Sequence, residues 1–188
     1  IATPNLFPQG FSGAVDLCID HHPSNALYAG DTLLHAEKSA CGEAVLDVIE
    51  LLTGRVTEQE ANLLYIAVTT DTGCFQYSNT TADTLRIAAA CKDAGADTYP
   101  INKLFFGTKS FARLKLEARL TGSAECYADG KVALGELPQA WLEELGASED
   151  DVDSISCFAR SIEGVEIGIM ISEVEDGGGK ISLRTSEN

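Results

Sequence analysis

The first apolar run of the chain is short and continuous. Residues 14–20 read AVDLCID, a pattern that is typical of a buried β-strand. Pro23 and Asn25 follow in the polar cluster 20–25, and both residue types favour turns. We therefore predict a strand over 14–20 that ends in a loop rich in polar side chains.

Apolar residues next recur at helical spacing, in segments over 41–52, from 57 toward 69–73, over 82–94 and over 100–120. Gly54 and Gly95 follow the first and third segments, where glycine commonly ends a helix. Thr57 and Glu60 have the spacing of a capping box, which satisfies backbone donors at a helix start. The first 120 residues therefore predict a helix-rich α/β unit.

After Gly122 the pattern changes to short strands, expected over 123–128, 131–137, 165–174 and 180–183, with helices over 138–145 and at 148–153. Asp129-Gly130 is a strong hairpin signal between the first two strands. The glycine-rich segment 175–179 joins strand to strand, whereas a phosphate-binding glycine loop opens a helix, so a hairpin turn is favoured. This part predicts a smaller α+β unit.

Composition narrows the function classes. With 45% hydrophobic and 22% charged residues among 188, the chain has the balance of an ordinary folded protein, and no apolar run approaches the roughly 18 residues of a membrane span. The formal charge of −16 argues against coating long nucleic acid, which needs clustered Lys and Arg. A small phosphorylated substrate stays open. The basic run from Lys103 to Arg119 is either a solvated helix face or a phosphate-attracting surface.

The six cysteines, at 18, 41, 74, 91, 126 and 157, form no CxxC pair. Metal knuckles and small disulfide scaffolds use tighter spacing, so we expect reduced cysteines in a cytoplasmic protein. The chain begins with Ile1 rather than Met, and no signal segment follows it, so we expect an internal piece of a longer protein.

Two of the three histidines, His21 and His22, are adjacent and follow Asp20 at the end of the predicted strand. Open α/β sheets bind ligands at the carboxyl ends of their strands. Neutral imidazole is a good metal ligand, and a neighbouring carboxylate can set its tautomer. The alternatives for this pair are metal or phosphate chemistry and a surface pair without a role. His35 lacks such neighbours and is expected to be structural or exposed.

Asp71, in the sequence TTDTGCF, is a second candidate. It follows an apolar helix, and Gly73 allows the backbone to come close to a ligand. Alone, such an aspartate is typical of a turn or a helix cap. Together with the histidines it offers carboxylate oxygen beside imidazole nitrogen, which a hard or borderline cation prefers.

The ordered set of motifs resembles the DHH phosphoesterase superfamily. The motifs are Ile19-Asp20-His21-His22-Pro23-Ser24-Asn25, Cys41-Gly42-Glu43, Thr70-Asp71-Thr72-Gly73-Cys74-Phe75-Gln76-Tyr77, Ser78-Asn79-Thr80-Thr81, Gly164-Val165-Glu166 and Lys180-Ile181-Ser182-Leu183-Arg184. Within the superfamily the chain looks most like the bacterial oligoribonucleotide phosphodiesterases (nanoRNases) that also act as pAp phosphatases. The resemblance implies a partial parallel-sheet DHH domain over 1–107, a linker helix over 108–121 and a smaller α+β DHH-associated substrate domain over 122–188.

The resemblance also implies two-metal hydrolysis. Family members hold two Mn2+ ions, with Mg2+ or Co2+ as alternatives, that activate water against a phosphodiester or phosphomonoester. By resemblance, His21 and Asp71 are ligands of one metal. His22 is expected to contact the scissile phosphate while Asp20 steadies its imidazole, which makes all four residues catalytic candidates.

By the same resemblance, Ser182 and Arg184 are substrate-binding residues. They lie two apart on a strand and so point to one face, and arginine offers a forked donor for a phosphate. An ordinary exposed sheet edge is the alternative. The expected partner is a short oligoribonucleotide or pAp, rather than long nucleic acid or a membrane, and a homodimer stays open.

Parts of the family pattern have no counterpart in the chain. No His and Asp-x-Asp cluster precedes residue 20, and the bridging aspartate of the second motif is not matched, because Asp16 lies inside the predicted strand. No Gly-Gly-Gly-His stretch follows Arg184. A catalytic metal usually takes at least three protein ligands, so we expect the 188-residue chain by itself to be inactive or nearly so.

Two other functions are compatible with these residues. One is another activity of the superfamily, a cyclic-dinucleotide phosphodiesterase or an exopolyphosphatase, which would use the same metal core. The other is a non-catalytic nucleotide-binding relative that uses the same cleft without two metals. The acidic net charge does not distinguish between these functions, because bound metal ions can supply positive charge locally.

Overall fold

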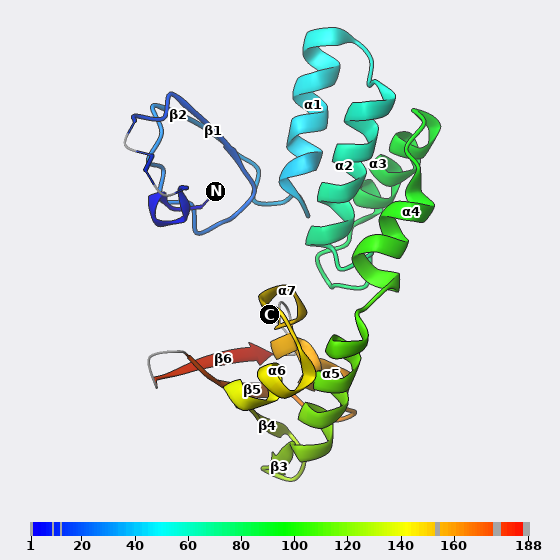
Figure 1. Cartoon of the computed structure of the whole chain (residues 1–188). Coiled ribbons are helices and arrows are strands. Elements are labelled where there is room, and N and C mark those ends of the chain that lie inside the picture. The colour runs from blue at the N-terminus through cyan, green and yellow to red at the C-terminus, as the bar shows by residue number, and fades with distance from the viewer. Residues whose placement is uncertain (1, 9, 12, 153–154, 175–177, 186–188) are drawn as a thin grey trace. The chain divides into compact units, whose positions relative to one another are not determined.

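The computed structural model describes residues 2–8, 10–11, 13–152, 155–174 and 178–185, which belong to two compact units, Ile1–Thr108 and Lys109–Asn188 (Figure 1). The predicted α/β class is confirmed, because one unit combines a parallel strand pair with helices and the other a four-stranded sheet with helices. The contacts group residues 109–121 with the second unit. That these units correspond to the two family domains, with a linker helix between them, stays a prediction.

The first unit contains a short parallel strand pair. Strand β1 (Leu17–Asp20) pairs with β2 (Asp31–Leu34), so that Asp20 lies opposite Leu34, and the 3-10 turn η1 (Pro4–Leu6) precedes them. The strand predicted from residue 14 begins at Leu17. The backbone oxygens of residues 15 and 16 still accept hydrogen bonds from residues 30 and 31, but the regular ladder starts only at Leu17.

Four helices and a π-helical turn complete the first unit: α1 (Cys41–Thr53), α2 (Glu58–Asp71), α3 (Ala82–Asp93), α4 (Thr98–Asn102) and η2 (Lys103–Gly107). The capping box of Thr57 and Glu60 is present at the start of α2, and Gly54 ends α1 in the left-handed conformation, as predicted. Leu46, Leu64 and neighbouring side chains of α1, α2 and α3 form the core between these helices.

The helical pattern predicted over 100–120 is present but interrupted, by extended backbone between 107 and 111. The π-turn η2 ends at Gly107, and Thr108 is extended. A new helix, α5 (Phe111–Ser123), then begins where the Ser110 hydroxyl accepts a hydrogen bond from the Arg113 amide. The N-cap bond satisfies a backbone donor that an uninterrupted helix would have paired internally.

The second unit contains a four-stranded sheet in the order β3-β4-β5-β6, formed by Glu125–Tyr127, Val132–Leu137, Ile167–Glu173 and Gly179–Thr185. The β3–β4 hairpin is present, with Ala128 and Asp129 both in the left-handed region. Strands β4 and β5 are parallel and are connected through α6 (Gln139–Leu145), α7 (Glu149–Val152) and the 3-10 segment η3 (Ile155–Ser161). Strands β5 and β6 pair antiparallel, and residues 175–177 of the predicted glycine-rich turn lie outside the described residues.

One face of this sheet packs on helices. Leu116 and Leu120 of α5 are fully buried with Leu137 and Met170 from the sheet. Gly135 of β4 allows this close approach, because a Cβ there would lie 2.8 Å from the Leu120 side chain. In the register of β4, β5 and β6, the residues Lys180, Ser182 and Arg184 lie on the same face of the sheet as Leu137 and Met170.

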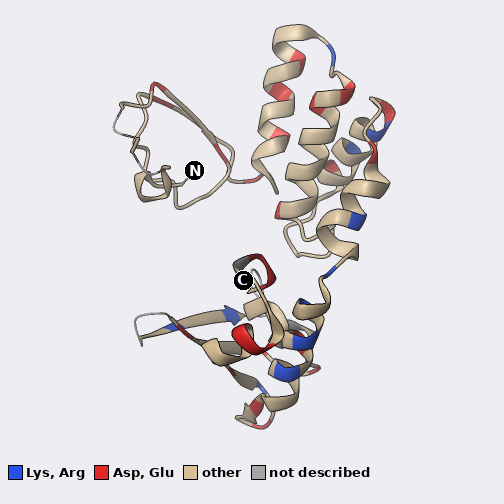
Figure 2. Ribbon diagram, viewed as in Figure 1, with Lys and Arg blue, Asp and Glu red and all other residues tan. Residues whose placement is uncertain are grey.

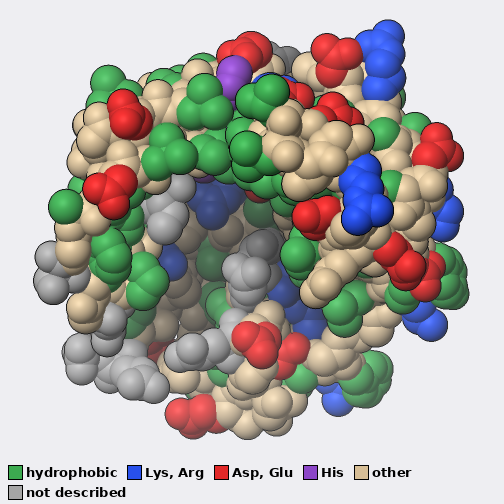
Figure 3. Space-filling view, turned by 90° about the horizontal axis from the view of Figure 1, so that it is seen from above, with side chains coloured by type: hydrophobic (Ala, Val, Ile, Leu, Met, Phe, Trp, Pro, Cys, Tyr) green, Lys and Arg blue, Asp and Glu red, His purple; other side chains and the backbone are tan. Residues whose placement is uncertain are grey.

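Basic residues recur along α5 (Figure 2), and Lys109, Arg113 and Arg119 form ion pairs within the second unit. Lys109 and Arg113 both contact Glu117 at 2.8 Å, and Arg119 pairs with Glu144 at 2.7 Å. This pairing favours the solvated helix face over a phosphate-attracting surface. On the face shown in Figure 3, acidic side chains are spread among apolar and uncharged ones. All six cysteines are free, and every helix among the described residues is too short or too polar to cross a membrane.

The approach of α1 to α2 depends on Gly42. A Cβ at this position would lie 2.9 Å from the Ala67 Cβ and 3.5 Å from the Leu64 carbonyl oxygen. Gly42→Ala is therefore expected to lower the free energy of unfolding of the first unit by about 1–3 kcal/mol, as overpacking does. Gly122→Ala in α5 is the control, since nothing lies within 4 Å of its Cβ. Urea denaturation in which Gly42→Ala is as stable as wild type would contradict this packing.

Candidate active site

Asp20 ends β1 and is almost fully buried, with 1% of its surface exposed. Its Oδ1 accepts hydrogen bonds from the His21 amide at 2.9 Å and from His22 Nδ1 at 2.7 Å. Its Oδ2 accepts a hydrogen bond from Asn25 Nδ2 at 2.6 Å. The carboxylate therefore holds the whole turn after the strand in place.

These contacts keep Asp20 ionised. Burial opposes ionisation, but the hydrogen bonds from His22, Asn25 and the His21 backbone outweigh burial and hold the pKa of Asp20 well below its usual range. An ionised carboxylate only accepts hydrogen bonds, so His22 must carry a proton on Nδ1. The Nε2 edge of His22 is thereby left for another partner.

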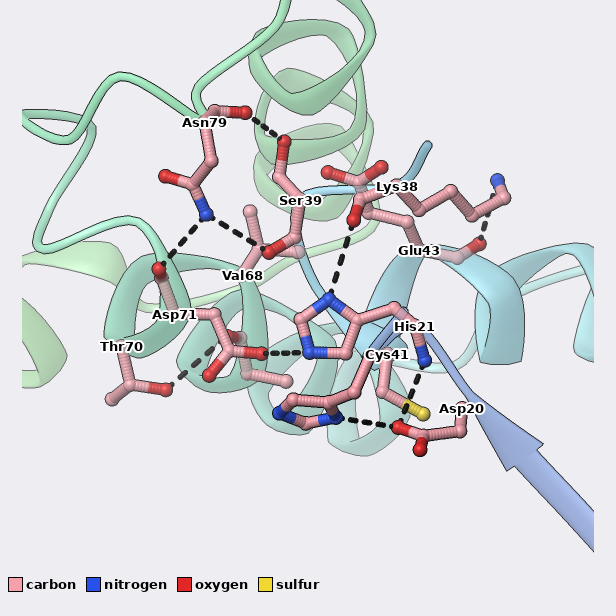
Figure 4. Close-up of polar contacts among 12 residues, drawn as sticks. Asp20, His21, Lys38, Ser39, Cys41, Glu43, Val68, Thr70, Asp71 and Asn79 are labelled. Atoms are coloured by element: carbon pink, nitrogen blue, oxygen red, sulfur yellow. Dashed lines mark hydrogen bonds and ion pairs between the residues drawn. The ribbon is translucent and has the colours of Figure 1, made fainter. Parts of the chain in front are cut away.

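The His21 ring packs edge to face on that of His22, with centroids 4.3 Å apart, and lies beside the end of α2 (Figure 4). Its Nδ1 lies 3.2 Å from the Lys38 carbonyl oxygen, which can only accept, so Nδ1 is the protonated nitrogen of neutral His21. Its Nε2 lies 3.6 Å from Oδ2 of Asp71, the last residue of α2. The structure thus brings a histidine lone pair from one end of the motif set next to a carboxylate about fifty residues away in the chain.

This pair fits a divalent metal ion. Ligand atoms about 2.0–2.2 Å from a common ion are about 3–3.5 Å apart, close to the observed Nε2–Oδ2 separation. Among the described residues, Asp20, His21 and His22 form a group whose donor atoms lie within 4.8 Å. Both Asp20 oxygens already accept hydrogen bonds, however, so the donor set best suited to a metal is His21 with Asp71.

The segment after Asp71 is held in an unusual backbone conformation. Gly73, Cys74 and Phe75 have φ values of 56°, 56° and 67°, all in the left-handed region. The Tyr77 ring packs on Gly73, where an added Cβ would lie 2.4 Å from the ring. Left-handed non-glycine residues cost free energy and are often found at functional sites, and here they turn the chain away directly after Asp71.

The other predicted positions lie as follows. Ser182 and Arg184, in the second unit, line a cavity of about 550 Å3 together with Lys180 and the apolar side chains Leu137 and Met170. His35 is paired with exposed Glu37 at 2.9 Å. Asp16 is exposed, outside the group of metal-ligand side chains found among the described residues.

Sequence reasoning missed three partners of the site. Asn25 was included in the first motif and interpreted as a turn residue, without the bond that it donates to Asp20. Asn79, which donates to the backbone oxygens of Ser39 and Asp71, was included in a motif without a role, and the Lys38 carbonyl was not considered. An Asn two residues after Pro in a loop that follows a buried Asp was the available signal for Asn25, whereas backbone contacts leave no residue-type signature.

Comparison with known proteins gives consistent relatives. No family model matches the chain. The bifunctional oligoribonuclease and PAP phosphatase NrnA of Thermus thermophilus is 29% identical over 89% of this chain and 49% of that protein. The probable NrnA of Streptococcus mutans is 25% identical over 89% of this chain and 53% of that protein. The chain therefore spans about half the length of the curated relatives it matches.

A solved structure matches in the same range. An exopolyphosphatase-related protein from Bacteroides fragilis superposes with a TM-score of 0.83 at 25% identity, over 90% of this chain and 50% of that chain. Relatives of one kind thus cover nearly the whole sequence, in the order of the motifs.

The chain is thus similar to NrnA proteins and to an exopolyphosphatase-related protein, in line with the resemblance to the DHH phosphoesterase superfamily. The motif Asp20-His21-His22 forms a turn whose two imidazoles pack edge to face, with ring centroids 4.3 Å apart, and whose hydrogen-bond partners differ, the Lys38 oxygen for His21 and Asp20 for His22. The resemblance stated from the motifs is confirmed at the level of the superfamily and its NrnA-like members.

Asp20 predicts a pH dependence of stability. Its pKa is lower in the folded than in the unfolded state, so its contribution is fully present above the unfolded value near pH 4 and is lost as pH falls toward the folded value. Asp20→Asn should lower the unfolding free energy by about 1–3 kcal/mol at pH 7, because it weakens a buried acceptor of three donors. Measured by urea denaturation, the difference in unfolding free energy between Asp20→Asn and wild type should become smaller as the pH is lowered from about 5 to about 3, where carboxylates become protonated.

Glu37→Gln is the matched control, since Glu37 also contacts a histidine ring but is exposed. This substitution should leave the unfolding free energy unchanged at about pH 5 and at about pH 3. A difference between Asp20→Asn and wild type that stays constant with pH would contradict the assignment of a buried, ionised Asp20.

Proposed function

We propose that the protein carrying this chain is a metal-dependent phosphoesterase that hydrolyses short oligoribonucleotides, pAp or both. The observation that carries the proposal is the His21 Nε2 lone pair directed at the Asp71 carboxylate, beside a second imidazole anchored by Asp20. The names of the NrnA relatives support the substrate class.

The chain's own residues have separable tasks in this proposal. His21 and Asp71 would hold one of two Mn2+ ions. When bound, such ions activate water and stabilise the attacking and leaving oxygens of a phosphoryl transfer. Asp20 keeps His22 oriented through the bond to Nδ1, so that the Nε2 edge could face a phosphate oxygen.

The cavity of the second unit has features that suit a nucleotide. Its volume of about 550 Å3 is in the range of small-molecule sites. Its apolar floor, with Leu137 and Met170, suits the face of a base or sugar, and Ser182 and Arg184 at its rim suit a phosphate. A short nucleotide needs no extended basic surface, which agrees with the formal charge of −16.

A second candidate activity is exopolyphosphatase, favoured by the name of the structural relative from Bacteroides fragilis. A polyphosphate chain would not need the apolar side chains that line the cavity of the second unit. A non-catalytic nucleotide-binding relative is the third. We propose a cytoplasmic bacterial enzyme, and we expect the 188-residue chain alone to turn over little, because His21 and Asp71 give one metal fewer than three ligands.

The first test is hydrolysis with and without Mn2+. The full-length protein with Mn2+ should degrade di- to pentaribonucleotides and pAp. His21→Ala and Asp71→Asn should each lower the rate at least about 100-fold, since loss even of a ligand's hydrogen-bond partner costs 10–100-fold. His35→Ala is the control, because this histidine only contacts exposed Glu37. Full activity on polyphosphate with none on nucleotides would favour the second candidate, and no Mn2+-dependent turnover of any of these would favour the third.

The second test separates binding from chemistry. Arg184→Ala should raise the KM for a dinucleotide about 10-fold, as expected for loss of a charge-assisted hydrogen bond to phosphate, with a smaller change in kcat. Arg86→Ala removes an exposed arginine that pairs with Asp83 on α3, and should change neither constant. An Arg184→Ala enzyme with an unchanged KM would exclude this residue from substrate binding.

A further inference from the structure

Asn79 lies where three segments of the first unit meet (Figure 4). Its Nδ2 is 3.2 Å from the backbone oxygen of Ser39 and 3.2 Å from that of Asp71. Both partners are carbonyl oxygens, so only the NH2 side of the amide can face them, and its two hydrogens serve one oxygen each. In return, the Ser39 hydroxyl donates to the backbone oxygen of Asn79.

The bonds made by Asn79 connect the backbone segments that hold the two candidate metal ligands, His21 and Asp71. Ser39 directly follows Lys38, whose carbonyl oxygen receives the Nδ1 proton of His21. Asp71 carries the carboxylate that lies 3.6 Å from the His21 Nε2. One side-chain amide therefore connects the backbone that orients the imidazole to the backbone that carries the carboxylate.

The base of this connection is buried. The Ser39 Oγ lies 2.7 Å from the Thr84 Oγ1, and the Thr84 hydroxyl donates to Glu43 at 2.7 Å. Ser39, Thr84 and Glu43 are each at most 3% exposed. Ser39 lies just before α1, Glu43 lies in its first turn, and Thr84 lies on α3. Asn79 is exposed, but it is attached to a part of the core that has little freedom to move.

The geometry points to Asn79 as a positioning residue that sets the separation between His21 Nε2 and Asp71 Oδ2, and with it the affinity of this site for a divalent metal ion. The inference rests on the proposed function for the identity of the metal ligands. Asn79 itself does not contact the ion. It acts through the tautomer of His21 and through the place of the Asp71 backbone.

The test uses the 188-residue chain labelled with 15N-histidine. In wild type at pH 8, where roughly all imidazole is neutral, His21 should show the signature of a proton on Nδ1, and Mn2+ should bind with broadening of the His21 signals. Asn79→Asp replaces both donors by oxygen and places charge against two carbonyl oxygens. It should produce a mixture of His21 tautomers and weaken Mn2+ about 10-fold, the effect typical of lost outer partners. Asn79→Ala, which adds no charge, should act in the same direction.

Asn62→Asp is the matched control. Asn62 also bonds two backbone groups, donating to the Glu58 oxygen and accepting from the Asp97 amide, each at 2.9 Å, but it lies away from His21 in the hydrogen-bond network. It should lower thermal stability without changing the His21 tautomer or the Mn2+ affinity.

The outcomes separate this inference from the proposed function. If both Asn79 variants fold and keep the wild-type tautomer and Mn2+ affinity, Asn79 has no positioning role and the inference is overturned. If His21→Ala leaves Mn2+ binding unchanged, the proposed metal ligand is wrong, and the tautomer of His21 in the metal-free Asn79 variants still decides whether Asn79 orients that ring. If Asn62→Asp disturbs the His21 tautomer equally, the effect reflects general loss of stability and the inference also fails.

Discussion

The site depends on one buried charge, the carboxylate of Asp20 at the end of β1. A buried carboxylate is costly unless donors surround it, and this one receives three, from His21, His22 and Asn25. The three bonds hold the loop in a tight turn in which the two adjacent imidazoles pack edge to face and have different hydrogen-bond partners, Asp20 for His22 and the Lys38 oxygen for His21. One carboxylate thereby gives two identical side chains two different environments.

The second constraint is the close packing of α1 on α2. Because Gly42 has no side chain, the helices approach until Ala67 nearly touches the backbone, and α2 ends with Asp71 beside His21. Lys38 and Ser39 lie just before the start of α1. The position of α1 against α2 therefore also determines where the Lys38 carbonyl oxygen meets the His21 imidazole. Packing and chemistry share the same few residues.

The sequence predicted what is local. The α/β class, the capping box at Thr57 and the β3–β4 hairpin follow from short-range rules that the structure obeys. The motifs also led to His21 and Asp71, which the fold brings together. The apolar pattern over 100–120 runs on without marking where α5 begins, because the helix start at Ser110 is set by a cap and not by apolar spacing. Contacts such as His21 with the Lys38 oxygen, 17 residues apart, and Asn79 with Ser39, 40 apart, involve backbone oxygens that every residue has, so no pattern of residue types marks them.

The two ends of α2 have a consequence for how this protein can change during evolution. The helix is held at its start by the capping box and at its end by three successive left-handed residues, so neither end can slide. Each residue of an α-helix turns the chain by about 100°. A single insertion or deletion within these 14 residues would rotate the Asp71 carboxylate away from His21. The length of α2 therefore fixes the position of Asp71 relative to His21, and substitutions in this helix are more easily tolerated than changes in its length.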